Sequence, residues 1–367
     1  MHPFSCGQCG TTVYFENSQC GVCGATLGFV PEQRRMAAFA QAEADNTLWQ
    51  AQGAQQGQAW LPCANRLQHA VCNWMVAPDD HCSLCRSCRL TSHIPALAEP
   101  GNLERWRLFE QAKRRLVFSL IMLGLAPRPK TAPDDMQGLA FALQASLPGQ
   151  PPVLTGHDDG VITINAAECD DVQREAARVA FGEPARSLLG HLRHETAHWL
   201  QQAYIDNTPA IDTCRAVFGD ERVDYSAALA QHYQNGPPVG WALQHVSAYA
   251  SAHPWEDWAE TCAHYLLIVD AVQTAAAWGL QLNGPAAAAP QLVDAADVAP
   301  VDDLVLQQWL PVALFLNSMN RSLGQRDAYP YQMPDAVLHK LGTVQALLKA
   351  AAAGVPAQTT PALQQAA

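Results

Sequence analysis

The stretch His194-Glu195-Thr196-Ala197-His198 lies in a segment, Ser187 to Ala203, whose residue pattern predicts an α-helix. Residues four positions apart on a helix lie one above the other, so the two imidazoles project from the same face. This H-E-x-x-H spacing presents two nitrogens to one zinc ion. The carboxylate of Glu195 points about a third of a turn away, beside the metal. There it can accept a proton from a zinc-bound water.

A third metal ligand is expected from a second predicted helix. Pro254 suits the first position of a helix that begins after His253, and acidic residues follow in its first turns. Glu256 and Glu260 lie four positions apart and therefore on one face. The pattern resembles zincins in which a glutamate binds the metal and an acidic residue one turn later hydrogen-bonds a ligand histidine. The resemblance makes Glu256 the ligand and Glu260 its helper, while the reverse assignment stays open.

Amide hydrolysis also needs a donor that stabilises the oxyanion of the tetrahedral intermediate. His245, Tyr249 and His253 precede the second predicted helix closely enough to reach over the metal. Tyr249 stands seven residues before Glu256, a spacing similar to that of a catalytic tyrosine in some zincins with a glutamate ligand. We therefore expect Tyr249 to be this donor. Ordinary packing or a structural hydrogen bond is the alternative for all three side chains.

The twelve cysteines form two groups in the N-terminal part of the chain and a few scattered singles. The first group is two C-x2-C pairs with neighbouring glycines, and its members are Cys6, Cys9, Cys20 and Cys23. Each pair forms a knuckle, and two knuckles complete a tetrahedral zinc site. No basic and apolar leader precedes the first cysteine. We therefore expect a cytoplasmic protein whose thiols stay reduced and bind zinc instead of forming disulfides.

The second group can supply one more four-cysteine site with one thiol left over. Its members are Cys63, Cys72, Cys82, Cys85 and Cys88. Cys85-x2-Cys88 is the natural knuckle, and we expect Cys63 and Cys72 to complete the set, which leaves Cys82 as the spare. Both four-cysteine sites are expected to be structural. Four protein ligands leave no open coordination position, and such short segments bury too little apolar surface to fold without a bound metal ion.

Two alternatives stay open for the second site. Cys82-x2-Cys85 is an equally acceptable knuckle by spacing, and His69 or His81 could replace a thiolate. The remaining cysteines are scattered singles and are expected to be buried thiols; they are Cys169, Cys214 and Cys262. With one catalytic and two structural sites, we expect three zinc ions per chain.

Together these motifs resemble a bacterial family of zinc-binding metallopeptidases that join an N-terminal zinc ribbon to a gluzincin-like domain. Beside the first four cysteines, the likeness is carried by Cys72-Asn73-Trp74, Cys85-Arg86-Ser87-Cys88-Arg89-Leu90, Thr155-Gly156-His157, Gly190-His191-Leu192-Arg193-His194-Glu195-Thr196-Ala197-His198, Phe218-Gly219-Asp220-Glu221-Arg222, Ser247-Ala248-Tyr249-Ala250 and Pro254-Trp255-Glu256-Asp257-Trp258-Ala259-Glu260-Thr261. It extends from Phe4 to about Leu347. The resemblance implies a zinc-dependent peptidase. Members often carry Ile-Gly where Thr196-Ala197 stand here, but neither position is in the ligand set.

Composition predicts an ordinary globular protein rather than a membrane protein. Apolar residues make up 49% of the chain, and no run approaches the roughly 20 residues that cross a bilayer. A net charge of −12 argues against nucleic acid as the main partner. We therefore expect a peptide or protein substrate, and a protein partner for the ribbon, which has almost no basic residues.

The chain is expected to have an α+β fold in five parts. These are a zinc ribbon (1–30), a Gln- and Ala-rich helical linker (31–58), a second cysteine-rich zinc module (59–99), a mainly helical zincin-like metallopeptidase domain with a small β-hairpin or sheet (100–348), and a disordered tail (349–367). Helices in the large domain are predicted over 103–125, up to Ala145 after a Pro-rich break, and over 187–203, 255–278 and 301–323. The stretch 210–241 is predicted to be mostly helical with a Gly-Pro-Pro break.

Two β-rich runs around Asp159-Gly160, Val153–Thr155 and Val161–Ile164, predict a hairpin. We expect Val161–Asn165 to lie beside the metal helix with a free edge on which an extended substrate could pair. A hairpin that only covers the core is the alternative.

Two other functional classes are open to the sequence. One is a zinc-stapled protein-interaction adaptor with a vestigial peptidase fold. The presence of Glu195 argues against it, because a structural zinc has no use for a general base. The other is a nucleic-acid factor directed by the ribbon, which the negative net charge disfavours.

Overall fold

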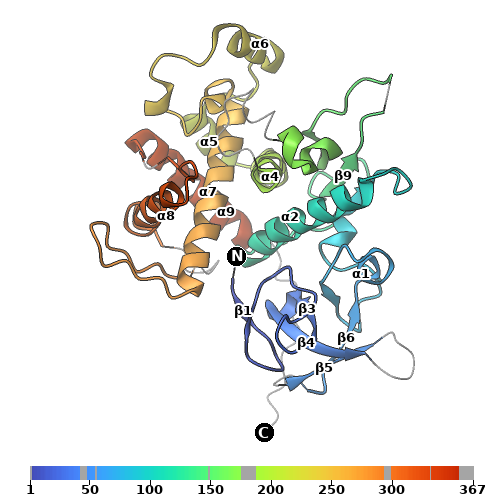
Figure 1. Ribbon diagram of the computed structural model, residues 1–367. Helices are drawn as coiled ribbons and strands as arrows, with labels where there is room; N and C mark the ends of the chain where they lie inside the picture. Colours follow the sequence, from blue (N-terminus) through green and yellow to red (C-terminus); the bar gives the residue numbers. More distant parts are fainter. Residues whose placement is uncertain are drawn as a thin grey trace.

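The computed structural model describes residues 2–41, 48–53, 56–147, 149–174, 187–292, 299–330 and 332–354 (Figure 1). The strands are β1 (Phe4–Ser5), β2 (Thr12–Val13), β3 (Thr26–Val30), β4 (Arg35–Gln41), β5 (Trp49–Ala51), β6 (Ala59–Pro62), β7 (Met75–Val76), β8 (Thr91–His93), β9 (Ala140–Gln144), β10 (Gly156–Asp158) and β11 (Val161–Asn165). The α-helices are α1 (Ala64–His69), α2 (Asn102–Met122), α4 (Leu188–Tyr204), α5 (Ala210–Phe218), α6 (Tyr225–Asn235), α7 (Pro254–Ala277), α8 (Leu310–Ser322) and α9 (Asp335–Gly354). The short 3-10 helices are η1 (Pro31–Gln33), η3 (Cys88–Leu90), η4 (Ala166–Cys169), η5 (Trp241–Leu243) and η6 (Tyr249–Ser251). The element η7 (Asp303–Trp309) is a π-helix that leads directly into α8.

One five-stranded antiparallel sheet, in the order β3-β4-β5-β6-β7, joins the two cysteine-rich segments. The prediction of a helical linker over residues 31–58 is therefore wrong, because β4 and β5 lie within it. Alanine and glutamine favour helices locally, but Met36 and Phe39 are buried and β4 pairs with a strand on each side. Tertiary packing outweighs the local preference. The segments predicted as ribbon, linker and second module form one N-terminal unit.

An aromatic cluster anchors this unit to the helical part of the chain. The rings of Phe15 and Phe29 lie 4.9 Å apart, and Phe29 lies at the same distance from Trp74, next to the second cysteine group. Phe118 of α2 packs on Phe15 at 5.3 Å and on Phe29 at 5.5 Å. Burial of these rings fixes the N-terminal unit on α2, which in turn packs on α4 (Figure 1).

A second sheet has the order β10-β11-β9-β8, and β9 runs parallel to both of its neighbours. The predicted short helix ending at Ala145 is wrong, since Ala140–Gln144 forms β9. Residues Ala140 to Leu143 are all buried. A central parallel strand covered on both faces is a continuous apolar run, and its periodicity does not distinguish it from a short buried helix.

The predicted hairpin turn at Asp159-Gly160 is confirmed, and both residues have positive φ, 45° and 78°. Its first strand begins at Gly156 and not at Val153. The expectation of a free edge at Val161–Asn165 is wrong, because β11 pairs with β10 on one side and β9 on the other. The strand at the edge of the sheet that contacts α4 is β10.

The helices predicted over 103–125, 187–203 and 255–278 are confirmed as α2, α4 and α7, and α4 lies between α2 and α7 (Figure 1). The segment 210–241 forms two separate helices, α5 and α6, and the segment 301–323 forms the π-helix η7 followed by α8. A further helix, α9, packs on α5 and α7. It runs to Gly354, so the first residues of the expected tail are helical, with Leu347 and Leu348 buried just before them. Residues 355–367 of that tail lie outside the described residues. Within the described part of the chain, no helix is both long and apolar enough to span a bilayer.

Candidate metal centre

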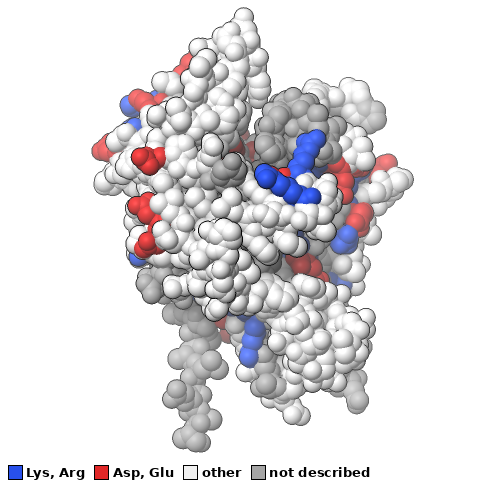
Figure 2. Space-filling view, turned by 60° about the vertical axis from the view of Figure 1, so that its left-hand side comes forward, with Lys and Arg blue, Asp and Glu red and all other residues white. Residues whose placement is uncertain are grey.

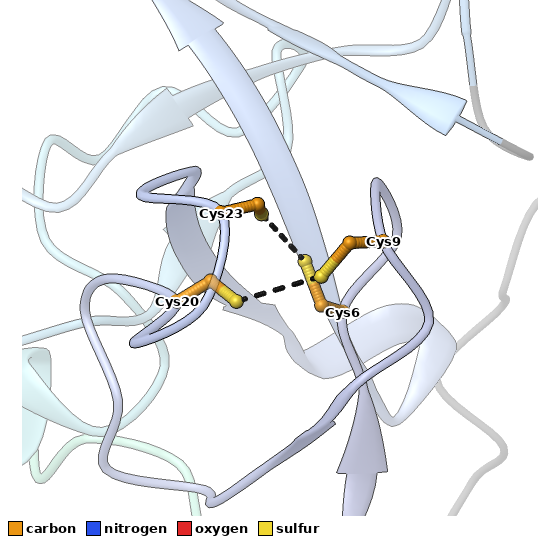
Figure 3. Close-up of side chains that lie close together, drawn as sticks. All are labelled: Cys6, Cys9, Cys20 and Cys23. Atoms are coloured by element: carbon orange, nitrogen blue, oxygen red, sulfur yellow. Dashed lines mark hydrogen bonds between the residues drawn. The ribbon is translucent and has the colours of Figure 1, made fainter.

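The first four-cysteine group converges as predicted. Its thiols point toward one another in Figure 3 and belong to Cys6, Cys9, Cys20 and Cys23. The Sγ–Sγ distance is 3.7 Å for Cys6 with Cys23 and for Cys9 with Cys20. A tetrahedron with Zn–S bonds of about 2.3 Å has edges of about 3.8 Å, so the four sulfurs fit a zinc ion.

The second group also converges, and all its members are buried: Cys63, Cys72, Cys85 and Cys88. The Sγ atoms of Cys72 and Cys85 lie 3.7 Å apart. Cys82 lies outside the group, and its backbone N–H donates to Asp80. The structure therefore brings together the four cysteines that were predicted and leaves out the expected spare.

Neither histidine that could have replaced a thiolate does so. The ring of His69 packs on Trp106 at 5.1 Å, and His81 is exposed. Positive charge compensates the buried thiols instead: Arg114 is buried and donates to the carbonyl of Val71 at 2.6 Å. The pKa of Cys72 lies well below its usual value, because hydrogen bonds from neighbouring thiols and the charge of Arg114 outweigh the opposing effect of burial.

The H-E-x-x-H stretch lies in the middle of α4. Ser187 caps this helix by accepting a hydrogen bond from the N–H of Gly190 at 3.0 Å. The indole N–H of Trp258 on α7 donates to the carbonyl of Ala197 at 2.8 Å, between the two histidines. Because both groups are buried, this hydrogen bond sets the position of α7 along α4 and brings the two predicted ligand helices together.

The helix α7 begins as the sequence predicts. His253 is its N-cap, and its Nδ1 accepts a hydrogen bond from the N–H of Trp255 at 3.1 Å. Glu256 follows in the first turn with only 1% of its surface exposed. A carboxylate buried this deeply needs a positive partner.

That partner site is the pair of imidazoles on α4. Glu256 Oε2 lies 3.0 Å from His194 Nε2 and 3.6 Å from His198 Nε2, and the two nitrogens lie 3.2 Å apart. Among the described residues, this buried oxygen has no hydrogen-bond partner. The pKa of Glu256 lies well below its usual value, because the two imidazoles outweigh the effect of burial. Two imidazole nitrogens and one carboxylate oxygen that converge in this way fit a zinc ion with three protein ligands.

Hydrogen bonds orient two of these three side chains: Glu260 contacts His194, and Tyr225 contacts Glu256. Glu260 Oε1 lies 2.7 Å from His194 Nδ1, and its other oxygen accepts a hydrogen bond from the hydroxyl of Ser247 at 2.6 Å. Nδ1 then carries the proton, which leaves the lone pair of Nε2 for a metal. The hydroxyl of Tyr225 donates to Glu256 Oε1 at 2.6 Å, so the other oxygen of Glu256 faces the imidazoles.

Glu195 is 5% exposed and contacts a residue that the sequence analysis did not single out as functional. Its Oε1 lies 3.2 Å from Nε2 of His191, and Nδ1 of His191 lies 2.5 Å from Glu168 Oε2. Burial lowers the pKa of His191, but the two carboxylates outweigh it and raise this pKa to about 9. Both ring nitrogens therefore donate at neutral pH.

Of the three candidate oxyanion donors, only Tyr249 is beside the ligand cluster. Its ring lies 6.1 Å from that of His194, and burial raises the pKa of its hydroxyl above the usual value. His245 lies 3.2 Å from the buried carboxylate of Asp257. His253 caps α7 and donates through Nε2 to the carbonyl of Val223 at 3.1 Å. The Nδ1 of His245 also accepts a hydrogen bond from Lys340 Nζ at 3.3 Å, so both histidines have structural partners.

Four residues of the site were missed from the sequence: His191, Ser247, Tyr225 and Glu168. His191 was detectable, because it stands four positions before Glu195 on the same helix face. Ser247 lies within one of the quoted motifs but has no spacing that marks it. Tyr225 reaches Glu256 from a different helix, and no local pattern predicts that contact.

Comparisons with known proteins show which families the chain is similar to. Residues 102–347 match the family described as "Putative zinc-binding metallo-peptidase", and residues 3–99 match a zinc-ribbon domain that spans both cysteine groups. Uncharacterized proteins of Mycobacterium tuberculosis and Mycobacterium bovis are 42% identical to the chain over 344 residues, which is 93% of this chain and 93% of each relative. No solved structure matches the chain significantly. The chain therefore belongs to this family of zinc-binding metallo-peptidases, with a zinc-ribbon domain preceding the peptidase region.

Proposed function

We propose that the protein is a zinc-dependent peptidase of the gluzincin type, with a zincin-like catalytic domain. His194, His198 and Glu256 would hold the catalytic zinc. The observation that carries this proposal is the buried Glu256 Oε2, which lies 3.0 and 3.6 Å from the two imidazole nitrogens. Three protein ligands leave a coordination position for solvent, as in catalytic zinc sites.

The side chains around this site have the roles that hydrolysis needs. Zinc, when bound, supplies a Lewis acid that polarises a carbonyl and lowers the pKa of water. Glu195 accepts a proton from the attacking water and passes it to the leaving amine. Tyr249 keeps its proton because its pKa is raised, and donates a hydrogen bond to the developing oxyanion.

The two four-cysteine groups would each bind a structural zinc, which brings the total to three zinc ions per chain. A peptide or protein is the favoured substrate, and the surface supports this choice over nucleic acid. The chain has a net charge of −12. On the face drawn in Figure 2, the described Lys and Arg side chains stand singly or in small groups beside acidic ones and do not form a continuous basic area.

Cleavage of a labelled unfolded protein such as casein by purified wild type and Glu195→Gln tests the proposal. We expect Glu195→Gln to lower kcat by about 10²- to 10⁴-fold, because it removes the general base. Its zinc content should stay at three per chain. Glu104→Gln, an exposed substitution on α2, is the matched control and should cleave at the wild-type rate.

Equal cleavage by wild type and Glu195→Gln would contradict the proposal. A wild-type protein that binds three zinc ions but has no zinc-dependent cleavage of unfolded proteins or of a mixed peptide library would favour the adaptor with a vestigial peptidase fold.

A further inference from the structure

His191 links two carboxylates at the metal centre. It stands one helical turn before Glu195 on α4, with Nε2 at 3.2 Å from Glu195 Oε1 and Nδ1 at 2.5 Å from Glu168 Oε2. The three side chains are 18% or less exposed. Each ring nitrogen has a carboxylate partner, so neither is free to bind a metal, and His191 is not a fourth ligand.

Glu168 is itself held by the hairpin that flanks α4. It lies on η4, directly after β11, and accepts a hydrogen bond from the hydroxyl of Thr155. The same hydroxyl oxygen accepts a hydrogen bond from the N–H of Asn165 at 3.0 Å. A continuous series of contacts therefore runs from the sheet through Glu168 and His191 to Glu195.

We propose that His191 is a positioning residue for Glu195: it holds one carboxylate oxygen and so leaves the other to take the proton of the attacking water. This inference rests on the proposed function. A general base acts only within hydrogen-bond reach of the proton it removes, about 2.6–3.2 Å. An untethered glutamate has several rotamers, and a misplacement of about 1 Å at a catalytic group can cost about 100-fold in rate.

A purely structural explanation makes a different prediction. If His191 only compensated the buried charge of two carboxylates, its loss would lower stability and leave the chemistry of the folded enzyme unchanged. A positioning role lowers kcat in enzyme that is still folded and fully loaded with zinc, while KM changes little.

The test compares His191→Ala and His191→Gln with the wild type on the casein substrate. We expect His191→Ala to lower kcat by about 10- to 100-fold, with KM unchanged within about 2-fold and zinc content unchanged. His191→Gln should recover part of the rate, because its amide N–H can donate to Glu195. His264→Gln is the matched control: His264 is also half-buried, but its partner is the hydroxyl of Tyr329, at 2.6 Å. The His264→Gln variant should keep the wild-type kcat.

Thermal unfolding of the zinc-loaded protein adds a readout that does not depend on activity. The losses of Tm in His191→Ala and Glu195→Gln should be less than additive in the double variant, because both remove the same contact. Additive losses would overturn the inference, as would a folded, zinc-loaded His191→Ala with the wild-type kcat.

Failure of this inference is distinguishable from failure of the proposed function. In the first case the wild type cleaves, Glu195→Gln does not, and His191→Ala cleaves like the wild type. In the second case wild type and Glu195→Gln are equally inactive, which removes the positioning role together with the function.

Discussion

Nδ1 of His194 lies 2.7 Å from Oε1 of Glu260, on the side of the ring away from the ligand cluster. Nε2 of the same ring lies 3.0 Å from Glu256 Oε2. The two glutamates stand one turn apart on α7, so one helix supplies both a candidate ligand and the group that orients another ligand. This geometry favours Glu256 as the metal ligand, which is the assignment that the sequence analysis preferred to the reverse one.

The two glutamates should therefore respond differently to neutralisation. Glu256→Gln removes an anionic ligand, and we expect zinc content to fall from three to two per chain. Glu260→Gln should retain three in excess zinc but weaken the affinity of the catalytic site by about 10- to 100-fold. Competition with a chromophoric chelator measures both effects, with Glu104→Gln as the control. The opposite order of effects would make Glu260 the ligand.

Cys72 and Cys82 provide a matched pair of variants that tests the proposed second structural zinc site. Cys72 is buried within the four-thiol group, whereas Cys82 lies outside it. Structural zinc contributes about 10 kcal/mol or more to the folding of small zinc domains. We therefore expect Cys72→Ser to lose one zinc ion and the cooperative unfolding transition of the N-terminal unit. Cys82→Ser should keep that zinc ion and that transition. Metal analysis and circular dichroism during heating check this, and loss of zinc in Cys82→Ser would revise the ligand set.

The contact between Trp258 and Ala197 should control both stability and metal binding. Trp258→Phe keeps the aromatic packing but removes the indole N–H that donates to the carbonyl of Ala197. We expect a loss of about 1–3 kcal/mol in the free energy of unfolding, measured with urea, and a weaker catalytic zinc site. Trp278→Phe is the control, because Trp278 is 54% exposed. A fully stable Trp258→Phe would show that other contacts set the position of α7 on α4.

The loop before β9 should make the free energy of unfolding depend on pH in the acid range. Asp135 accepts hydrogen bonds from both terminal nitrogens of Arg128 at 2.6 Å and from the N–H groups of Thr131 and Gly138 at 3.1 Å. Arg128 first, and then these N–H groups, hold the pKa of Asp135 well below its usual value against the effect of burial. The folded state therefore favours the ionised carboxylate. Its contribution to stability is present above the unfolded-state pKa of about 4 and is lost as pH falls through the folded-state value.

Asp135→Asn tests this dependence. The variant should have a lower Tm than wild type at pH 7, and the difference should shrink as pH falls below about 4. Asp134→Asn, at the exposed neighbouring position, is the control for the change of charge. A difference in Tm that is independent of pH would contradict the assignment.

The candidate site was more predictable than the fold around it. His194, Glu195 and His198 follow from the H-E-x-x-H spacing on one helix, and the roles of Glu256 and Glu260 from the resemblance to zincins with a glutamate ligand. Tyr225 and Glu168 were not predictable, because they reach the site from elements distant in the chain.

The errors in the fold have the same physical origin. Residues of β4 and β9 have local preferences or periodicity compatible with a helix, and only pairing with neighbouring strands makes them strands. Pairing between distant segments is also what places β11 inside its sheet and β10 at the edge. The sequence predicted the turn at Asp159-Gly160 but not β9, the strand that pairs with the hairpin.

The most direct test of the central claim is the zinc content of the folded chain, measured by mass spectrometry before and after mild chelation, together with cleavage of casein. We expect three zinc ions before and two after, with cleavage lost in parallel and restored by one equivalent of zinc. The labile ion should be missing from His198→Ala from the start. Two zinc ions in untreated wild type, or a labile ion that persists in His198→Ala, would contradict a catalytic zinc held by His194, His198 and Glu256.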